Sequence, residues 1–321
     1  MNPEKINFRQ TRDFGETFNV SIKFLRQNFK LFFQSVLFIA GPFVLISAIA
    51  GAFYQSNAIN MFSITKLGNG GLDTILSQFG WAYLIFILAA ILASLALMST
   101  VYSFMINYQE KGPGGFTVSD VNRTVINNLG NVLSVFFVLG LLILVFVIIL
   151  VLIIAGIAVA VPALGVLLIF LLIIAMLMVM PPLMWQFSAT YLVKMTEQKG
   201  IFESFGRTRQ VMRENFWWTW VIVVCASLAV GLAGIVFTIP QAGYQMVLMF
   251  SRMKEGTSDT PMGFLIVATI CTFCTTILYS TLSVIFGFHY FSLAEKKDGT
   301  GLMERINEIG NTPTNNVEQQ Y

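Results

Sequence analysis

The chain has 321 residues, of which 56% are hydrophobic and 11% are charged. Soluble domains carry about 25% charged residues, so the composition excludes an ordinary soluble protein and indicates an integral membrane protein. The net charge of +3 comes from basic residues that are confined to a few segments. Such a distribution is typical of topology signals and argues against a nucleic-acid partner.

The N-terminal region is predicted to lead into the membrane as an amphipathic helix over residues 8–30. It contains acidic residues and no short apolar core before a cleavage site, so we expect no cleavable signal peptide. Two interpretations of the helix remain open. It lies in the headgroup layer with its basic face toward anionic lipid, or it packs on the bundle as a cytoplasmic helix. Its apolar stripe comprises Phe14, Phe18, Ile22, Leu25, Phe29 and Phe32, and its polar side comprises Arg12, Glu16, Asn19, Lys23, Arg26 and Lys30.

Two apolar runs, Leu31–Phe53 and Trp81–Tyr108, predict the first membrane hairpin. Pro42 lies inside the first run and is expected to kink it, because proline cannot donate a backbone hydrogen bond. The polar loop between the two runs offers two candidate interfacial helices, Ile59–Ile64 and Leu72–Phe79.

A run of 70 residues without Asp, Glu, Lys or Arg, Thr124–Val193, predicts the middle hairpin. One helix of that length would measure about 105 Å, over three times the hydrocarbon thickness, so the run must fold back. Because this hairpin is the most apolar of the three, we expect it to form the structural centre of the bundle. The turn residues Gly156, Pro162 and Gly165 divide it into spans at Val132–Ala155 and Val166–Thr190, with Pro181 and Pro182 bending the second.

The last hairpin follows an entry helix at Ile201–Asn215. Its first span is expected at Phe216–Ile239, ending at Pro240, and its second span at Met262–Ala294. A short helix around Leu302–Ile309 and a disordered polar tail over residues 311–321 complete the predicted elements.

The distribution of basic residues checks this division into six spans. With six spans, one side of the membrane holds the N-terminus, the 109–130 loop, the 191–215 loop and the C-terminus, which carry 16 of the 19 Lys and Arg residues. A single crossing by the charge-free run would divide them 10 against 9. The positive-inside rule therefore favours six spans, with both termini on the cytoplasmic side of a bacterial inner membrane.

An internal repeat is predicted from the entry helices. The pattern E-x-F-x7-R-x-N-F occurs twice without gaps, as Glu16, Phe18, Arg26, Asn28 and Phe29 and as Glu203, Phe205, Arg213, Asn215 and Phe216. A weaker copy, capped by Thr117 or Ser119, places Val121, Asn131 and Val132 at the matching positions. We therefore expect one all-α membrane domain over residues 1–310, built from three units at 8–108, 117–193 and 201–294.

The segment 203–217, ESFGRTRQVMRENFW, resembles the entry motif of a broad group of uncharacterised bacterial six-span membrane proteins. That group includes the membrane domain associated with glycerophosphodiester phosphodiesterases. The resemblance covers the span organisation of nearly the whole chain. It implies a membrane domain without the phosphodiester chemistry, because in the fused members that chemistry belongs to a separate soluble domain that has no counterpart here.

Two sets of residues are candidates for binding. The first set lies near the membrane boundary and predicts lipid-headgroup or interfacial anchors, because arginine reaches phosphate and tryptophan prefers the interface. The second set forms a weakly polar path along the sixth span, or bonds only its own backbone and neighbouring helices. The anchors are Arg26, Asn28, Arg207, Arg213, Asn215, Trp217, Trp218 and Trp220, and the path is Thr269, Thr272, Thr276, Ser280, Ser283 and His289.

No catalytic, cofactor or metal site is predicted. His289 is the only histidine, so neither a metal site nor a Ser/His/Asp set has enough partners. Cys271 and Cys274 form a C-x-x-C inside an apolar span and are expected to be buried, inert thiols. We therefore expect a non-enzymatic scaffold or accessory subunit for lipid or a partner complex. The alternative is an uncoupled transporter or lipid-translocating protein that uses the polar path.

The predicted topology is tested by reporter fusions. Fusions after Glu110 and Lys199 should report the cytoplasm, and fusions after Asn69 and Thr257 should report the outside, because 16 of 19 basic residues lie on the first side. Paired enzymatic reporters, each active on one side only, give the measurement. A swapped pattern would contradict both the topology and the three-unit organisation.

Overall fold

The computed structural model describes residues 4–61, 72–160, 162–255, 261–299, 301 and 303, and within these residues it contains helices and no strand. Six segments are long and apolar enough to cross a membrane: Phe29–Asn57, Gly80–Lys111, Leu129–Phe146, Phe170–Glu197, Phe216–Ser251 and Met262–Asp298. The prediction of an all-α bundle with six spans is confirmed. The short helix around Leu302–Ile309 and the tail 311–321 lie outside the described residues, except for 303.

The helices follow one another in three groups, each with a short helix before a pair of long ones. The first group comprises α1 (Phe14–Gln27), α2 (Phe29–Ser35), the π-helix η1 (Val36–Ala40), α3 (Gly41–Met61) and α5 (Leu72–Lys111). The second comprises α6 (Val118–Asn127), α7 (Leu129–Ala160) and α8 (Pro162–Glu197). The third comprises α9 (Ile201–Arg213), α10 (Phe216–Glu255), α11 (Met262–Leu278) and α12 (Ser280–Asp298).

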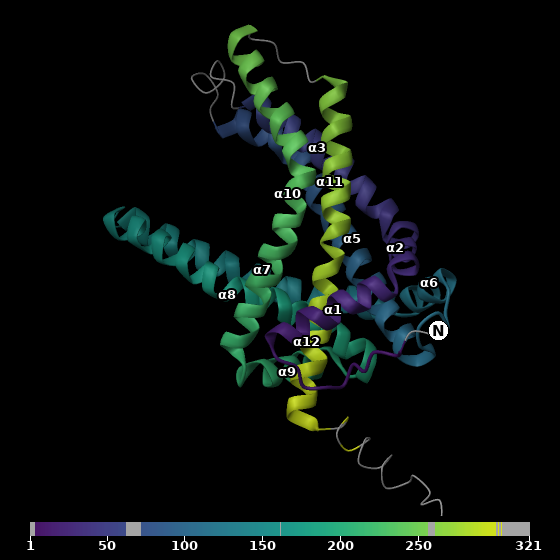
Figure 1. Cartoon of the computed structure of the whole chain (residues 1–321). Coiled ribbons are helices and arrows are strands. Elements are labelled where there is room, and N and C mark those ends of the chain that lie inside the picture. Colours follow the sequence, from purple (N-terminus) through teal and green to yellow (C-terminus); the bar gives the residue numbers. More distant parts are fainter. Residues whose placement is uncertain are drawn as a thin grey trace, which may run out of the picture.

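The main core lies at one end of the molecule, which we call the base (Figure 1). There the C-terminal part of α5, the end of α8 and α12 pack together, and the short helices α1, α6 and α9 surround them. The largest fully buried side chains include Tyr102, Tyr108, Trp185, Tyr191 and Phe288. Toward the opposite end, α3 packs on α5 and α11, and α11 packs on α10.

Hydroxyl groups join the helices of the base across its core. Tyr102 on α5 bonds Ser188 on α8, and Ser99 Oγ lies 3.0 Å from the Tyr191 hydroxyl between the same helices. Trp185 donates its indole N–H to the Phe286 carbonyl on α12 at 3.3 Å. Between apolar helices such bonds add direction to packing that would otherwise depend on shape alone.

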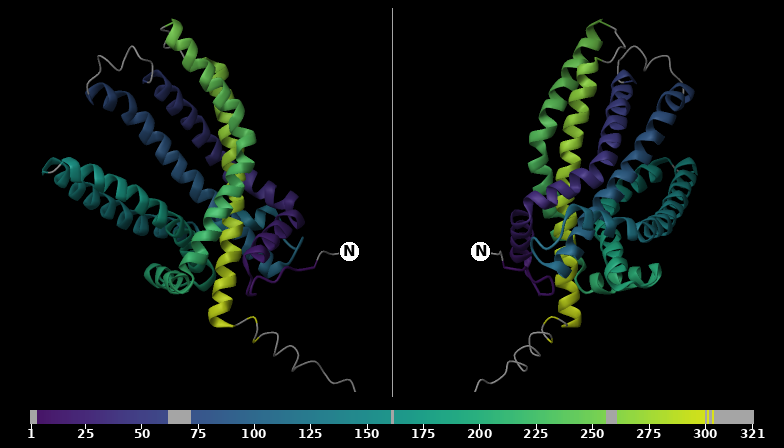
Figure 2. Two further views of the ribbon diagram at one scale, coloured as in Figure 1. Left: turned by 60° about the vertical axis from the view of Figure 1, so that its left-hand side comes forward. Right: turned by 90° about the vertical axis from the view of Figure 1, so that its right-hand side faces the viewer.

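The middle hairpin does not form the centre of the bundle, as the sequence had led us to expect. Its outer part, residues 141–180, which we call the arm, extends away from the other long helices (Figure 2, left). Leu144, Val145 and Phe146 are consecutive and all exposed, and together they cover about 200° of the helix surface. The arm is therefore covered mainly along the seam between α7 and α8. Its apolar composition fits contact with lipid hydrocarbon instead of burial in protein.

Several predicted helix ends were wrong because the membrane helices continue past the residues that were expected to end them. Pro240 does not end the fifth span, since α10 continues to Glu255, and Leu72–Phe79 is the start of α5 instead of a separate helix. Gly156 lies within α7, which continues to Ala160, and Pro162 is the first residue of α8. The candidate helix at 59–64 is the end of α3 as far as Met61, and the rest of it lies outside the described residues.

The first and sixth spans depart from a continuous α-helix. Ahead of Pro42, the backbone widens into η1, where the Gly41 N–H bonds the Val36 carbonyl. Because Pro42 has no N–H for the carbonyl one turn earlier, the predicted distortion takes the form of a π turn. The sixth span is interrupted at Tyr279, between α11 and α12, although it contains no proline there.

Each entry helix meets its span at an asparagine with the same hydrogen bonds. The Asn amide donates to the carbonyl four residues earlier, and the Asn carbonyl accepts the N–H four residues later. These junctions are Asn28, Asn128 and Asn215, so the middle junction lies three residues before the expected Asn131. At the other end, an acidic side chain accepts from the N-cap N–H in all three: Glu16 from Asp13, Asp120 from Thr117 and Glu203 from Gly200.

Helix α1 has one face on the bundle and another on the surface. Thr17, Ser21 and Phe24 are buried against the base, whereas Ile22 and Lys23 are exposed. The buried face is therefore rotated from the predicted apolar stripe. The helix packs on the bundle, which was one of the two open interpretations, and of the stripe only Ile22 and Phe29 are exposed.

A glycine in α12 allows α12 and α5 to pack closely at the base. A Cβ at Gly287 would lie 2.8 Å from Met105 Cε and 3.4 Å from the Tyr102 ring, whereas nothing lies within 4 Å of a Cβ at Gly231 on α10. We expect Gly287→Val to reduce the free energy of unfolding by about 1–3 kcal/mol, because the added methyls overpack the core. Thermal unfolding in nanodiscs measures this, with Gly231→Val as the matched control. Equal melting temperatures for the two variants would contradict this packing.

Candidate functional site

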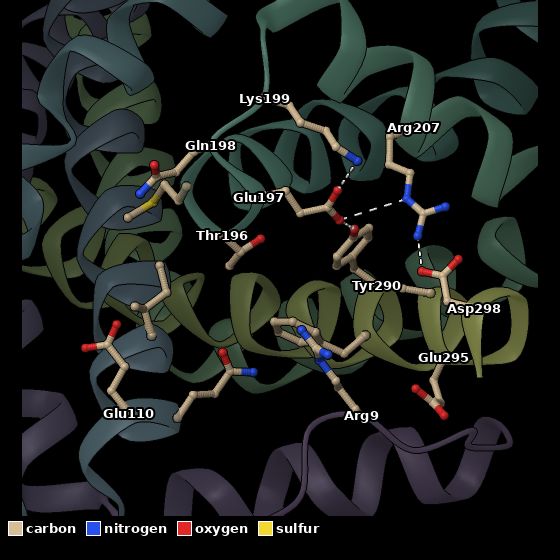
Figure 3. A pocket seen from close by; sticks show the side chains of 15 residues that line it. Arg9, Glu110, Thr196, Glu197, Gln198, Lys199, Arg207, Tyr290, Glu295 and Asp298 are labelled. Carbon is tan, nitrogen blue, oxygen red and sulfur yellow. Dashed lines mark hydrogen bonds and ion pairs between the residues drawn. The ribbon is translucent and has the colours of Figure 1, made fainter. Parts of the chain in front are cut away.

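A polar hollow of about 490 Å³ opens at the base, between the end of α5, the turn from α8 to α9, and α12 (Figure 3). Charged and amide side chains dominate its wall, in contrast to the apolar spans. Its polar lining comprises Arg9, Gln109, Glu110, Thr196, Glu197, Gln198, Lys199, Arg207, Tyr290, Glu295 and Asp298. It is the best candidate for a functional site because it gathers ionisable groups from four parts of the chain.

The turn from α8 to α9 forms one wall of the hollow. Gln198 has φ of 50°, a left-handed conformation that lets the chain reverse immediately after α8. Glu197 accepts hydrogen bonds from Lys199 at 2.5 Å and from the Tyr290 hydroxyl on α12 at 2.9 Å. The turn is therefore fixed to α12 through a carboxylate.

Arg207 on α9 is the cation at the centre of this network. It bonds Asp298 at the end of α12, and its Nε lies 3.9 Å from Glu197. Burial opposes the charged form, but the hydrogen bond and charge of Asp298 outweigh it and raise the pKa of Arg207. Arg207 thus stays charged and holds α9 against α12. This contact differs from its predicted role as a lipid anchor.

The other predicted anchors fall into two groups. Asn28 and Asn215 serve the helix junctions, and Asn215 also accepts a hydrogen bond from Lys296 at 3.0 Å. The remaining residues lie on the outside of the base: Arg26 and Arg213 are exposed, Trp217 is 67% exposed, Trp218 packs edge-on against Phe14, and Trp220 is half-buried. For this second group, a role at the lipid headgroups stays a prediction.

The structure does not place the predicted polar path along one helix. Thr269, Thr272 and Thr276 lie half-buried on α11, whereas Ser280, Ser283 and His289 belong to α12 beyond the break. Thr276 bonds the carbonyl of Thr272 on its own helix. Five hollows of the surface lie around the base, and none of these five is lined by a residue of the path.

His289 is a core residue of the base. Its Nε2 lies 3.0 Å from the Thr219 hydroxyl on α10, and its ring meets the edge of Trp185 at 5.3 Å. Among the described residues, no three His, Cys, Asp or Glu side chains lie close enough together to hold a metal ion. The Cys225, Cys271 and Cys274 thiols are free. Within the hollow, Lys199 and Arg207 pair with Glu197 and Asp298, and these contacts fix the α8–α9 turn and α9 to α12.

Sequence reasoning missed the residues that lie ahead of α1. Residues 4–13, which we call the strap, cross the base and insert Ile6 and Phe8 into the core. The signal was an apolar residue at two alternating positions, Ile6 and Phe8, before the capping residue Asp13. Two residues are too few for a periodicity argument, which needs several turns or a full strand.

Comparison with known proteins adds no identification, since no family model, curated protein or solved structure matches this chain.

The Arg207–Asp298 pair should contribute measurably to the stability of the base. A double-mutant cycle with Arg207→Met and Asp298→Asn is expected to give a coupling free energy of about 0.5–1 kcal/mol, because the pair is only partly shielded from water. Chemical unfolding in detergent micelles provides the four free energies. The exposed pair Lys111–Asp120, at 2.9 Å, is the matched control and should give a smaller value. A coupling no larger than that of the control would contradict a fixed contact between α9 and α12.

Proposed function

We propose that the chain is a non-enzymatic scaffold or accessory subunit of the bacterial inner membrane, which meets a partner membrane protein through the arm. The observation that carries the proposal is the exposure of the arm on consecutive positions, such as Leu177, Met178 and Val179 on α8. The core of the base lies elsewhere, so this part of the chain contributes little to the packing of its own fold. A two-helix projection with an apolar surface is suited to lie beside other transmembrane helices, with lipid filling the remaining space.

The polar hollow supports a binding role in place of catalysis. Its central cation and two of its carboxylates are engaged with one another at the α8–α9 turn and α12. These contacts fix the ends of two hairpins relative to each other. A scaffold requires such fixation, because a partner bound at one hairpin must keep its position relative to the others.

The orientation with both termini in the cytoplasm belongs to this proposal, and the base supports it. Lys5 of the strap bonds the Gln109 carbonyl at 2.6 Å, and Lys297 bonds Glu214 at 3.3 Å. The segments that carry most of the basic residues therefore meet at one end of the molecule. The three-unit organisation is proposed on a similar basis, from the matching bonds at the three asparagine junctions.

Photo-cross-linking tests the role of the arm. We expect p-benzoylphenylalanine at Phe146 on α7 to give a discrete protein adduct in native membranes, because this side chain is 65% exposed. The matched control is the same probe at Phe38 in η1, which is 68% exposed but lies on the first span, and it should give lipid adducts only. Mass spectrometry of the adducts provides the measurement. Lipid adducts alone from Phe146 would contradict a partner at the arm and favour a role in lipid handling.

A further inference from the structure

The strap crosses the base without helical structure and bends at residues 8–10, and over residues 5–9 its side chains alternate between the core and the surface. Ile6 and Phe8 are buried, at 6% and 3% exposure, whereas Lys5, Asn7 and Arg9 are exposed. This alternation is how an extended peptide presents every second side chain to the surface that binds it. The strap thus contacts the base in the manner of a bound peptide.

Phe8 occupies a box of aromatic rings from three helices. Its ring centre lies 4.7 Å from that of Phe288 and 5.4 Å from that of Phe291, both on α12. Phe24 on α1 lies 5.8 Å away and Tyr108 on α5 lies 5.7 Å away. Such edge-to-face and offset contacts give a pocket that selects an aromatic side chain.

Side chains of the base bind the backbone of the strap. The Ile6 N–H donates to the Tyr108 hydroxyl at 3.1 Å, and the Arg12 N–H donates to Ser292 Oγ at 2.8 Å. Gln27 donates its amide to the Glu4 carbonyl at 3.1 Å. Direct side-chain bonds to an extended backbone provide affinity that is independent of the peptide's exposed residues.

Hollows border the strap on both edges. One of about 410 Å³ lies between the strap and α1, and one of about 290 Å³ lies between the strap and the end of α12. The polar hollow of about 490 Å³ also reaches the strap at Arg9. Besides Ile6, Phe8 and the backbone bonds, the strap is held by Lys5 on the Gln109 carbonyl and by Arg12 over Phe288. The hollows leave the edges of its groove open to a competing segment.

We propose that the aromatic box and its flanking hydrogen-bonding groups form a docking groove for a short extended protein segment of the pattern Ile-x-Phe. The strap is the occupant supplied by the chain itself, and a partner's segment of the same pattern displaces it. The strap shows the required chemistry directly: an aliphatic residue, then an aromatic residue two positions later, with an arginine near enough to lie over Phe288, as Arg12 does at 5.6 Å.

This inference deepens the proposed scaffold function, since it names a second contact site for a partner, and its test is separate. Cross-linking at the arm detects a partner within the bilayer, whereas peptide binding detects occupancy of the groove at the base. Peptide binding without a protein adduct at Phe146 would support the groove and contradict the arm as a docking site. A protein adduct at Phe146 without peptide binding would support the arm and contradict the groove.

Peptide binding to a strap-deleted protein tests the groove. The probe is a fluorescent peptide of residues 4–12, EKINFRQTR, and the protein lacks residues 2–12 and is held in nanodiscs. We expect saturable binding by fluorescence anisotropy, at least tenfold tighter than to the full-length chain, in which the strap fills the groove. A peptide with Phe8→Ala should bind at least tenfold more weakly, and a peptide with Gln10→Ala should bind within twofold, because Gln10 is exposed.

A second variant guards against failure of the deleted protein to fold. Full-length Phe8→Ala keeps the strap but removes its anchor, so it should also bind the peptide more tightly than the wild-type chain does. Absence of binding to whichever variant folds, or equal binding of the Phe8→Ala peptide, would overturn the proposal. If neither variant folds, the strap is an integral part of the core and the proposal is likewise overturned.

Discussion

The hydrogen-bonded contact between α5 and α8 at the base is the interaction on which the other parts of the molecule depend. Tyr102 and Ser188, with Ser99 and Tyr191, form two bonds between apolar helices where lipid provides no polar alternative. The contact fixes the end of the middle hairpin to the first, and α12 packs on both, with Trp185 of α8 bonding the Phe286 carbonyl of α12. Because these contacts anchor the middle hairpin at the base, the arm can extend away without packing on the other long helices.

Sequence patterns predicted the number and order of the spans because the hydrocarbon core imposes a minimum apolar length on every crossing. They predicted helix ends poorly. Pro240 stops a helix in water, where the freed carbonyl finds other partners, but in a long apolar segment the helix continues because leaving it would expose more backbone. The break at Tyr279 has no local signal, since it lies where α11 leaves α3 and α12 enters the base, and tertiary packing determines it.

The candidate site was partly visible in the sequence. Arg207 was predicted as a lipid-headgroup or interfacial anchor, but its partner Asp298 is 91 residues away and no local pattern connects the two. The strap was invisible because its binding surface is assembled from α1, α5 and α12. The position of the middle hairpin was misjudged, because apolar composition places a segment in the membrane without saying whether protein or lipid surrounds it.

The strap also has a consequence for the order of events during synthesis. Arg12 bonds Ser292, 280 residues later, so the strap finds its binding site on a part of the chain that is synthesised much later. At about 5–20 residues per second, translation of the intervening chain takes roughly 14–56 s. During that time the binding site of the strap is incomplete, because α12, which carries Ser292, has not yet been made. Completion of the sixth span is thus the step that completes the binding site of the strap.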